Sequence, residues 1–257
     1  MKVSVVIITR NESHNIGECL ASVAFANEII VVDQSSEDET VAIARGCGAH
    51  VTVTADWPGF GIQKNRAIAL ATSDWVLSLD ADERISPELA KELQAVMANS
   101  QQDAYEIPRL TNFCGQWIHH CGWRPDHVLR LFRRGKAQFT EDLVHERVIL
   151  IQGTSLGRLK NDILHYSYPT PANYWRKLHA YSEAWARQRW RAGQRCSLTR
   201  AFASGFFAFL KSYIFRLGFM DRGMGLVVCT MQAQAAFAKY FTLYCLNQTD
   251  AINPKDK

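Results

Sequence analysis

The chain has 257 residues, of which 47% are hydrophobic and 21% charged. This length and composition describe a globular protein with one large domain, or one domain and an appendage, and exclude a disordered chain. The net charge of +4 is too small to favour nucleic acid as a partner. The 7 cysteines are odd in number and form no C-x-x-C pair, which argues against a disulfide framework or a zinc ribbon and for the reduced thiols of a cytosolic protein.

The charge is unevenly distributed along the chain. Between Arg158 and Arg222 the sequence has 12 Lys and Arg against 3 Asp and Glu, a local net charge of +9, which leaves −5 for the rest of a chain whose total is +4. Such asymmetry indicates an anionic partner or surface for the C-terminal part. No uncharged apolar stretch approaches the roughly 18–20 residues of a spanning helix, and Val3–Ile8 is too short for the core of a secretory signal.

The first eighty residues alternate between apolar runs typical of buried strands and segments with helical spacing. The expected strands are Val3–Ile8, Glu28–Asp33, His50–Thr54 and Trp75–Asp80. The expected helices lie around Ile16–Val23, Thr40–Arg45 and Gln63–Ala71. This alternation predicts an α/β fold with a mostly parallel sheet flanked by helices.

The next helix has a clear start, because Ser86 can cap it and Pro87 suits its first position. Three short β-like pieces follow and predict a mixed extension of the sheet, at Ala104–Pro108, Val128–Arg133 and Val144–Ile151. From Ala172 to about Leu246 the pattern predicts helices, and the polar segment Asn247–Lys257 is expected to be a flexible tail.

Polar residues follow the first two expected strands. The first strand ends in Thr9 and is followed by Asn11 and Glu12, with neither a G-x-G-x-x-G nor a P-loop, so NAD enzymes and P-loop NTPases are disfavoured. Asp33 ends the second strand. Ligands of α/β sheets bind at the carboxyl ends of strands, where such side chains can accept hydrogen bonds from a base or ribose. The alternative for each loop is that these polar residues cap the next helix.

Asp80 and Asp82 form the sharpest local signal. They follow an apolar strand and stand two residues apart, which directs both carboxylates to one side. Such a pair suits Mg²⁺ or Mn²⁺, which prefer oxygen ligands and are often shared with substrate phosphates. Glu83 is expected to support them as a neighbour, and His165 is a further candidate metal ligand, with a purely structural histidine as the alternative.

A second acidic cluster contains Glu141, Asp142 and Glu146. A transferase that attacks a sugar carbon with a hydroxyl needs a general base, usually a carboxylate, and all three residues qualify by type. The alternative is a solvated acidic loop.

Several stretches resemble a known family. Four stretches, taken in chain order, resemble glycosyltransferase family 2 with its GT-A fold: SVVIITRNE, EIIVVDQSSEDET, DWPGFGIQKNRA and WVLSLDADER. PRLTNFCGQWIHHCGW-x-PD-x-V-x-RLF and LVHERV are more similar to the bacterial lipopolysaccharide-core β-1,4-glucosyltransferases, which act on inner-core heptose. The resemblance extends from Met1 to about Tyr244. It implies a GT-A catalytic domain over residues 1–170, with a nucleotide-sugar half of about 1–100 and an acceptor half of about 101–170, then a basic, aromatic helical region over 171–246 and a flexible tail over 247–257.

The resemblance also implies roles for individual residues. The nucleotide site would comprise Thr9, Asn11, Glu12, Asp33 and Asp80, with Lys64 approaching the diphosphate. Asp80 and Asp82 match the family's D-x-D motif, with Asp82 in direct contact with the metal and His165 as the C-terminal metal ligand. The family's usual base lies in a Glu-Asp pair that heads a helix, and here Glu146 is favoured over Asp142 and Glu141.

The implied reaction is an inverting transfer of a sugar, glucose from UDP-glucose, to an inner-core heptose of lipopolysaccharide or lipooligosaccharide, with a divalent cation, Mg²⁺ or Mn²⁺, on the diphosphate. The alternatives are a family 2 transferase for another glycan, such as capsule or O-antigen, and a non-catalytic relative that binds glycan or membrane. The intact carboxylates Asp80, Asp82 and Glu146 argue against the non-catalytic alternative.

The basic C-terminal region interleaves aromatic residues with Lys and Arg, for example around Trp175, Trp185 and Trp190. It fits an amphipathic surface in the headgroup region of an anionic membrane, ordinary helix packing with a solvated basic face, or, as the least favoured alternative, nucleic acid. The resemblance favours the membrane, because the implied acceptor is lipid-anchored, and so implies a cytoplasmic protein held peripherally on the inner membrane. The pattern does not decide whether Phe206, Phe207, Phe209 and Leu210 are core, dimer contact or lipid contact.

Overall fold

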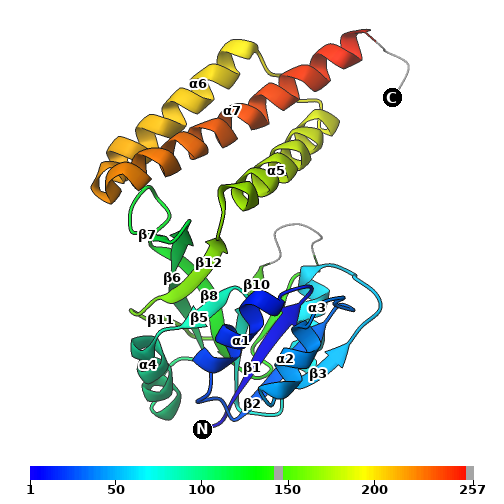
Figure 1. The fold of residues 1–257 in the computed structure, drawn as a ribbon, viewed down its shortest axis with the longest axis vertical. Helices are drawn as coiled ribbons and strands as arrows, with labels where there is room; N and C mark the ends of the chain where they lie inside the picture. Colours follow the sequence, from blue (N-terminus) through cyan, green and yellow to red (C-terminus); the bar gives the residue numbers. More distant parts are fainter. Residues whose placement is uncertain (142–146, 253–257) are drawn as a thin grey trace. The chain divides into compact units, whose positions relative to one another are not determined.

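The computed structural model describes residues 1–141 and 147–252. They form two compact units, which we call the sheet unit (Met1–Leu110 and Asp126–Ser167) and the helical unit (Thr111–Pro125 and the chain from Tyr168 onward) (Figure 1). The boundary does not follow the chain as the sequence analysis expected. Residues 111–125 join the helical unit because Phe113 and Ile118 are buried there against Val228 and Cys229.

The first half of the sheet unit alternates strands and helices as predicted. The strands β1 (Val3–Thr9), β2 (Glu28–Asp33), β3 (His50–Val53) and β4 (Trp75–Asp80) are parallel, in the order β3-β2-β1-β4. The helices α1 (Ser13–Ser22), α2 (Thr40–Gly46) and α3 (Phe60–Ala69) connect them. Every residue of β1 is buried, as expected for a central parallel strand covered on both faces.

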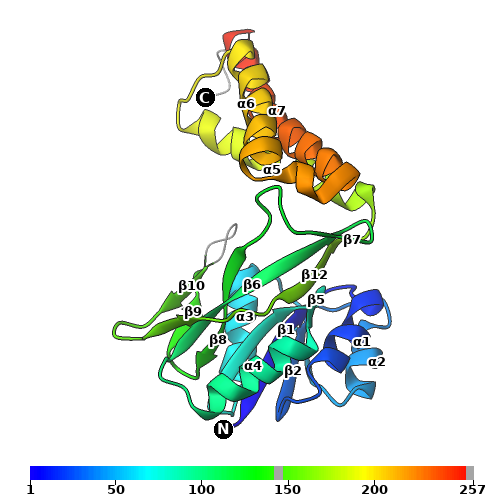
Figure 2. The ribbon, with the colours of Figure 1, turned by 90° about the vertical axis from the view of Figure 1, so that its left-hand side faces the viewer.

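The second half of the sheet unit is the predicted mixed extension. It continues the sheet in the order β4-β8-β6-β12-β5, with β8 antiparallel to β4 and β12 antiparallel to β5 (Figure 2). The bounds are β5 (Glu83–Ile85), α4 (Pro87–Ala98), β6 (Ala104–Phe113), β8 (Asp126–Arg133) and β12 (Ile163–Tyr168). The short strands are β7 (Gln116–Ile118) and β11 (Leu156–Arg158), which pair with β6, and β9 (Ala137–Phe139) and β10 (Val148–Leu150), which pair with each other. Strands β5, β7, β9, β11 and β12 were not predicted.

Helices cover both faces of the sheet. On one face Val5 and Ile7 of β1 pack in a cluster with residues of α1, α2 and α4, including Ile16 and Leu89. On the other face Val6 of β1 packs in a cluster with Ala67 of α3 and with Phe132 of β8. The alternation of side chains along β1 therefore serves two separate cores. Ser86 caps α4 as predicted, since its side chain accepts a hydrogen bond from Leu89 N.

The helical unit contains α5 (Pro171–Arg191), α6 (Leu198–Leu210), a π-helical turn η1 (Lys211–Phe215), a 3-10 turn η2 (Gly218–Asp221) and α7 (Arg222–Ile252). The expectation of a flexible tail from Asn247 is wrong for residues 247–252, because α7 continues to Ile252. Asn247 is buried and its Oδ1 accepts a hydrogen bond from Arg195 at 3.1 Å, which holds this turn of the helix. Among the described residues, no helix combines the length and the hydropathy needed to cross a bilayer.

Candidate active site

Strand register brings three of the predicted residues to one edge of the sheet. Thr9 of β1 pairs with Asp33 of β2, and Ile8 of β1 pairs with Asp80 of β4, so all three strands end at the same level. This is the carboxyl edge of the parallel strands, where α/β proteins bind ligands.

Thr9 and Asp33 are buried and bonded to each other. Thr9 Oγ1 donates to Asp33 Oδ2 at 2.7 Å, and Ser36 donates to the same carboxylate from its backbone N at 2.8 Å and from its hydroxyl at 2.6 Å. Asp33 therefore shapes the loop that follows β2. Its predicted contact with a nucleotide stays a prediction.

Asn11 and Glu12 form the loop after β1. Asn11 adopts φ 53, a left-handed conformation that Asn tolerates better than most residues, and its backbone N donates to Ser36 Oγ at 2.8 Å. Glu12 stands at the N-cap position of α1, but its side chain caps no backbone N–H and instead accepts from Asn15 Nδ2 at 2.9 Å. Glu12 therefore occupies the N-cap position that the capping alternative predicts, but its carboxylate does not cap the helix.

Asp80 is held between two buried cations. Lys64 Nζ of α3 lies 2.9 Å from Oδ1, and Arg130 Nη2 of β8 lies 2.5 Å from Oδ2. Burial by itself would raise the pKa of Asp80, but the charges of Arg130 and Lys64 outweigh it and hold that pKa well below its usual range. Asp80 is therefore an anion with both oxygens already engaged.

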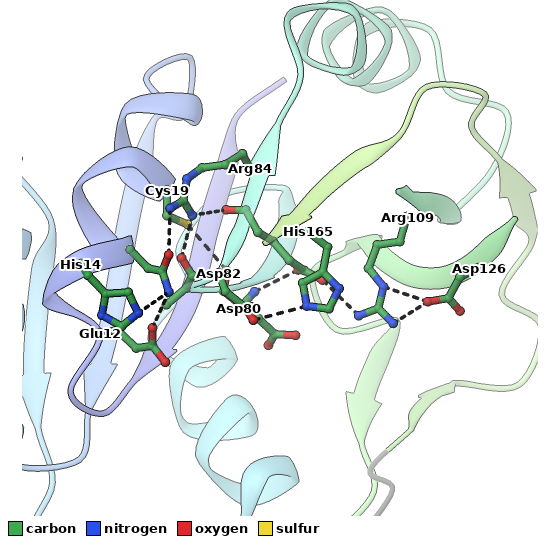
Figure 3. A network of polar contacts seen from close by, with 12 residues as sticks. Glu12, His14, Cys19, Asp80, Asp82, Arg84, Arg109, Asp126 and His165 are labelled. Carbon is green, nitrogen blue, oxygen red and sulfur yellow. Dashed lines mark hydrogen bonds and ion pairs between the residues drawn. The ribbon is translucent and has the colours of Figure 1, made fainter. Parts of the chain in front are cut away.

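Glu83 connects Asp80 and Arg130 to a third cation, Arg109. Its side chain is fully buried, Oε2 accepts from Asp80 N at 3.0 Å, and Oε1 contacts Arg130 Nη2 at 2.8 Å and Arg109 Nη1 at 3.2 Å. Arg109 continues to Asp126 at 2.5 Å (Figure 3). Burial lowers the pKa of Arg130, but Asp80 and Glu83 raise it by more, so the guanidinium stays charged. The three cations and three anions balance, and they fix the backbone and side chain of Asp80.

Sequence reasoning anticipated Glu83 as a neighbour but missed Arg109 and Arg130 as members of the site. A usable signal was present for Arg130, because its charge interrupts the apolar run VLRLF on a strand. Arg66 of α3 pairs with exposed Asp56, with 2.7 Å between Nη2 and Oδ2.

Asp82 and His165 meet because β5 and β12 are paired. His165 lies opposite Glu83 in that register, and its Nε2 is 3.3 Å from Asp82 Oδ2 (Figure 3). His165 Nδ1 is buried without a hydrogen-bond partner among the described residues. The pair fits a divalent cation, because two ligand atoms of an octahedral ion with bonds of about 2.1 Å lie about 3 Å apart.

Asp80 does not complete this pair into a cluster. Its oxygens contact Lys64 and Arg130, and the part of the chain that the structure describes holds no group of three or more His, Cys, Asp and Glu side chains arranged to bind a metal. Joint ligation by Asp80 and Asp82 therefore stays a prediction.

The predicted general bases fall at the edge of what the structure describes. Asp142 and Glu146 lie outside the described residues, and Glu141 is exposed after β9. The choice among the three stays a prediction.

Strand-end carboxylates and buried cations lie together at the carboxyl edge of the sheet, the edge at which α/β proteins bind their ligands. The model of the family described as glycosyl transferase family 2 matches residues 4–148. The chain belongs to glycosyl transferase family 2, and its fold is the GT-A fold.

Full-length relatives agree with this assignment. An uncharacterized glycosyltransferase of Rickettsia prowazekii is 32% identical over 93% of this chain and 85% of its own length. The lipopolysaccharide core biosynthesis glycosyltransferase LpsC of Rhizobium meliloti is 27% identical over 95% of this chain and 92% of its own length. The crystal structure of S. aureus TarS 1-349 in complex with UDP is similar in fold, with a TM-score of 0.50 and 15% identity over 100% of this chain and 93% of that chain.

Proposed function

We propose that this glycosyltransferase moves glucose from UDP-glucose, with inversion, to an inner-core heptose of a lipid-anchored lipopolysaccharide or lipooligosaccharide. The observation that carries the proposal is the Asp82–His165 pair, 3.3 Å apart, beside the fixed Asp80 at the carboxyl edge of the sheet. The name of LpsC, which aligns over nearly the whole chain, supports the lipopolysaccharide core as the acceptor.

In this proposal the nucleotide binds at the edge formed by the ends of β1, β2 and β4. Thr9 and Asp33 shape its floor, and Asn11 and Glu12 border it. Lys64, which contacts Asp80 at the same edge, would approach the diphosphate, as the family resemblance implies. The UDP in the TarS structure, which shares the fold, supports this choice of donor.

Asp82 and His165 would hold the divalent cation. A carboxylate suits Mg²⁺ and Mn²⁺ alike, whereas an imidazole nitrogen favours the softer ion, so this pair favours Mn²⁺. When bound, the cation supplies Lewis-acid charge to the leaving diphosphate.

The acceptor hydroxyl loses its proton to one carboxylate of the 141–146 segment as its oxygen forms a bond to the anomeric carbon. Glu146 is the favoured base, and Asp142 is the alternative. The bond from that carbon to the diphosphate oxygen breaks, and UDP leaves with the electron pair. Attack from the face opposite UDP inverts the anomeric centre, through an oxocarbenium-like transition state.

The basic helical unit supports the proposed place of action. Between Tyr168 and Arg222 this unit has 10 Lys and Arg against 2 Asp and Glu, a local charge of +8. This charge suits the anionic cytoplasmic face of the inner membrane, where a lipid-anchored acceptor is available. The protein would bind there peripherally.

Mass spectrometry of a purified core saccharide, after incubation with a panel of UDP-sugars and Mn²⁺, tests the function. One added hexose with UDP-glucose alone is the expected result. Transfer from another UDP-sugar, or to a capsule or O-antigen acceptor only, overturns the proposed substrates. Absence of both transfer and UDP-glucose hydrolysis overturns the enzyme assignment and favours a binding protein.

A further inference from the structure

The turn between α6 and α7 exposes an unusual number of large apolar side chains. We call residues 206–227 the tip. Nine of the 23 exposed large hydrophobic residues among the described residues lie in these 22 positions. They are Phe206, Phe207, Ile214, Phe215, Leu217, Phe219, Met220, Leu226 and Val227, with Phe215 at 77% exposure. A clustering of this kind marks an interaction surface, whereas scattered exposed apolar residues do not.

The backbone of the tip explains why these side chains point outward. Two glycines bring its turns into close contact: a Cβ on Gly218 would lie 2.5 Å from Cys229 Sγ, and one on Gly225 would lie 1.8 Å from Gly218 O. Leu217 and Arg222, at the two ends of η2, adopt positive φ angles that are uncommon for residues with side chains. The turns of the tip are therefore closely packed. Phe209, Tyr213 and Met224 are partly buried against the core of the helical unit, and the nine exposed side chains lie outside it.

The charges of the tip are all positive on its outer surface. Lys211, Arg216 and Arg222 are exposed. Asp221 is the only acidic residue between 198 and 240, and its side chain is 7% exposed. Its Oδ1 contacts His120 Nδ1 at 2.8 Å, and its Oδ2 accepts from His120 N at 2.8 Å. Negative charge is thus turned inward, and the exposed charged residues that lie among the exposed aromatic residues in the sequence are cations.

We propose that the tip inserts into the headgroup region of a bilayer that contains anionic lipid. Exposed aromatic and aliphatic side chains together with exposed Lys and Arg are the features that bind such an interface. A second copy of the chain is a poorer occupant, because a symmetric contact between two tips would bring like charges together. The inference rests on the proposed function, for which it names the membrane-binding element.

Sedimentation with vesicles tests the tip directly. The full chain is mixed with sucrose-loaded vesicles of phosphatidylcholine alone or with 30% phosphatidylglycerol. We expect binding to the mixed vesicles only. Phe215→Ser/Phe219→Ser should weaken it at least tenfold, and Lys211→Gln/Arg222→Gln should weaken it by roughly fivefold per cation. The matched control is Trp175→Ser/Tyr181→Ser, which removes two exposed aromatic residues of α5 and should leave binding unchanged.

Three results overturn the inference: no binding of the unmodified chain, equal loss in the α5 control, or a lipid-free dimer in light scattering that Phe215→Ser/Phe219→Ser converts to a monomer. Circular dichroism of each variant verifies that it is folded, and single Phe215→Ser replaces the double variant where that fails. UDP-glucose hydrolysis without vesicles separates this inference from the proposed function. Hydrolysis without vesicle binding overturns the membrane-binding role of the tip alone. Vesicle binding without hydrolysis and without sugar transfer overturns the enzyme assignment alone.

Discussion

The two units of this protein differ in whether the charged side chains discussed above are paired and buried or exposed. In the sheet unit, Lys64, Arg109 and Arg130 are matched to Asp80, Glu83 and Asp126 in one chain of contacts. In the helical unit, Lys211, Arg216 and Arg222 are exposed, and the nearby Asp221 is turned inward. Paired buried charges fix a geometry, whereas unpaired exposed charges remain available to a partner. The small net charge of the whole chain conceals this division.

The largest expected effect lies at the predicted metal pair. Asp82→Ala should reduce sugar transfer at least about 10³-fold, because a bound cation contributes several kcal/mol of charge stabilisation to the transition state. The measurement is the rate of UDP-glucose turnover over a range of Mn²⁺ concentrations.

Asp56→Ala is the matched control for this change, because Asp56 is an exposed carboxylate of the same unit that pairs with Arg66. It should leave turnover and its Mn²⁺ dependence unchanged. Near-normal turnover in Asp82→Ala would show that the pair does not hold the cation.

The next effect tests whether the buried charges fix the sheet unit. Arg130→Met leaves Asp80 and Glu83 without their shared cation and should lower the free energy of unfolding by about 3–5 kcal/mol. Urea denaturation followed by circular dichroism measures this.

The comparison variant is Arg158→Met, which removes an exposed guanidinium that pairs with Glu106. It should cost about 0–1 kcal/mol. Equal costs for the two arginines would contradict the distinction between paired buried charges and solvated ones.

A smaller effect tests the packing beneath the tip. Gly218→Ala would place a Cβ 2.5 Å from Cys229 Sγ and 2.9 Å from Ser212 O, so we expect a loss of about 1–3 kcal/mol. Gly223→Ala, at a position where a Cβ meets nothing within 4 Å, should be neutral or stabilise by up to about 1 kcal/mol. Thermal unfolding compares them, and equal melting temperatures would mean that the turn is loosely packed.

The smallest effect should be the same in both units. Ser86→Ala and Ser197→Ala each remove a side chain that caps the start of a helix, α4 in one unit and α6 in the other, and each should cost about 1 kcal/mol. Chemical denaturation of both variants measures this, with the matching Ser→Thr variants expected to retain most of the stability. A cost confined to one unit would show that the other tolerates an uncapped helix.

Much of the fold was predictable because local pattern and burial agree there. Continuous apolar runs specified β1, β2 and β4, and Ser86 with Pro87 specified the start of α4. The short strands β5 and β12 were not predictable, because these segments of 3 and 6 residues acquire strand structure by joining the sheet, β5 beside β12 and β12 between β5 and β6.

The candidate site shows the same division. Thr9, Asp33, Asp80 and Asp82 could be selected from the sequence, because they follow apolar strands and such strands end at one edge of a sheet. Arg109 and Arg130 come from a later part of the chain. The charge of Arg130 within an apolar strand marks it as unusual, but the local sequence does not identify Glu83 as the partner of either arginine. Their role depends on where β6 and β8 join the sheet.

By itself, the sequence determined the α/β class, the family and the carboxylates at the strand ends, because these depend on periodicity and on residue type. Only the tertiary structure decided that Asp80 contacts Lys64 and Arg130 while Asp82 contacts His165, since those contacts join residues up to 83 positions apart. It also decided that Phe206 and Phe207 are exposed whereas Phe209 is partly buried, because exposure depends on which face of α6 packs against α7. The sequence determines which residues are charged or apolar, whereas the fold determines which other residues they contact.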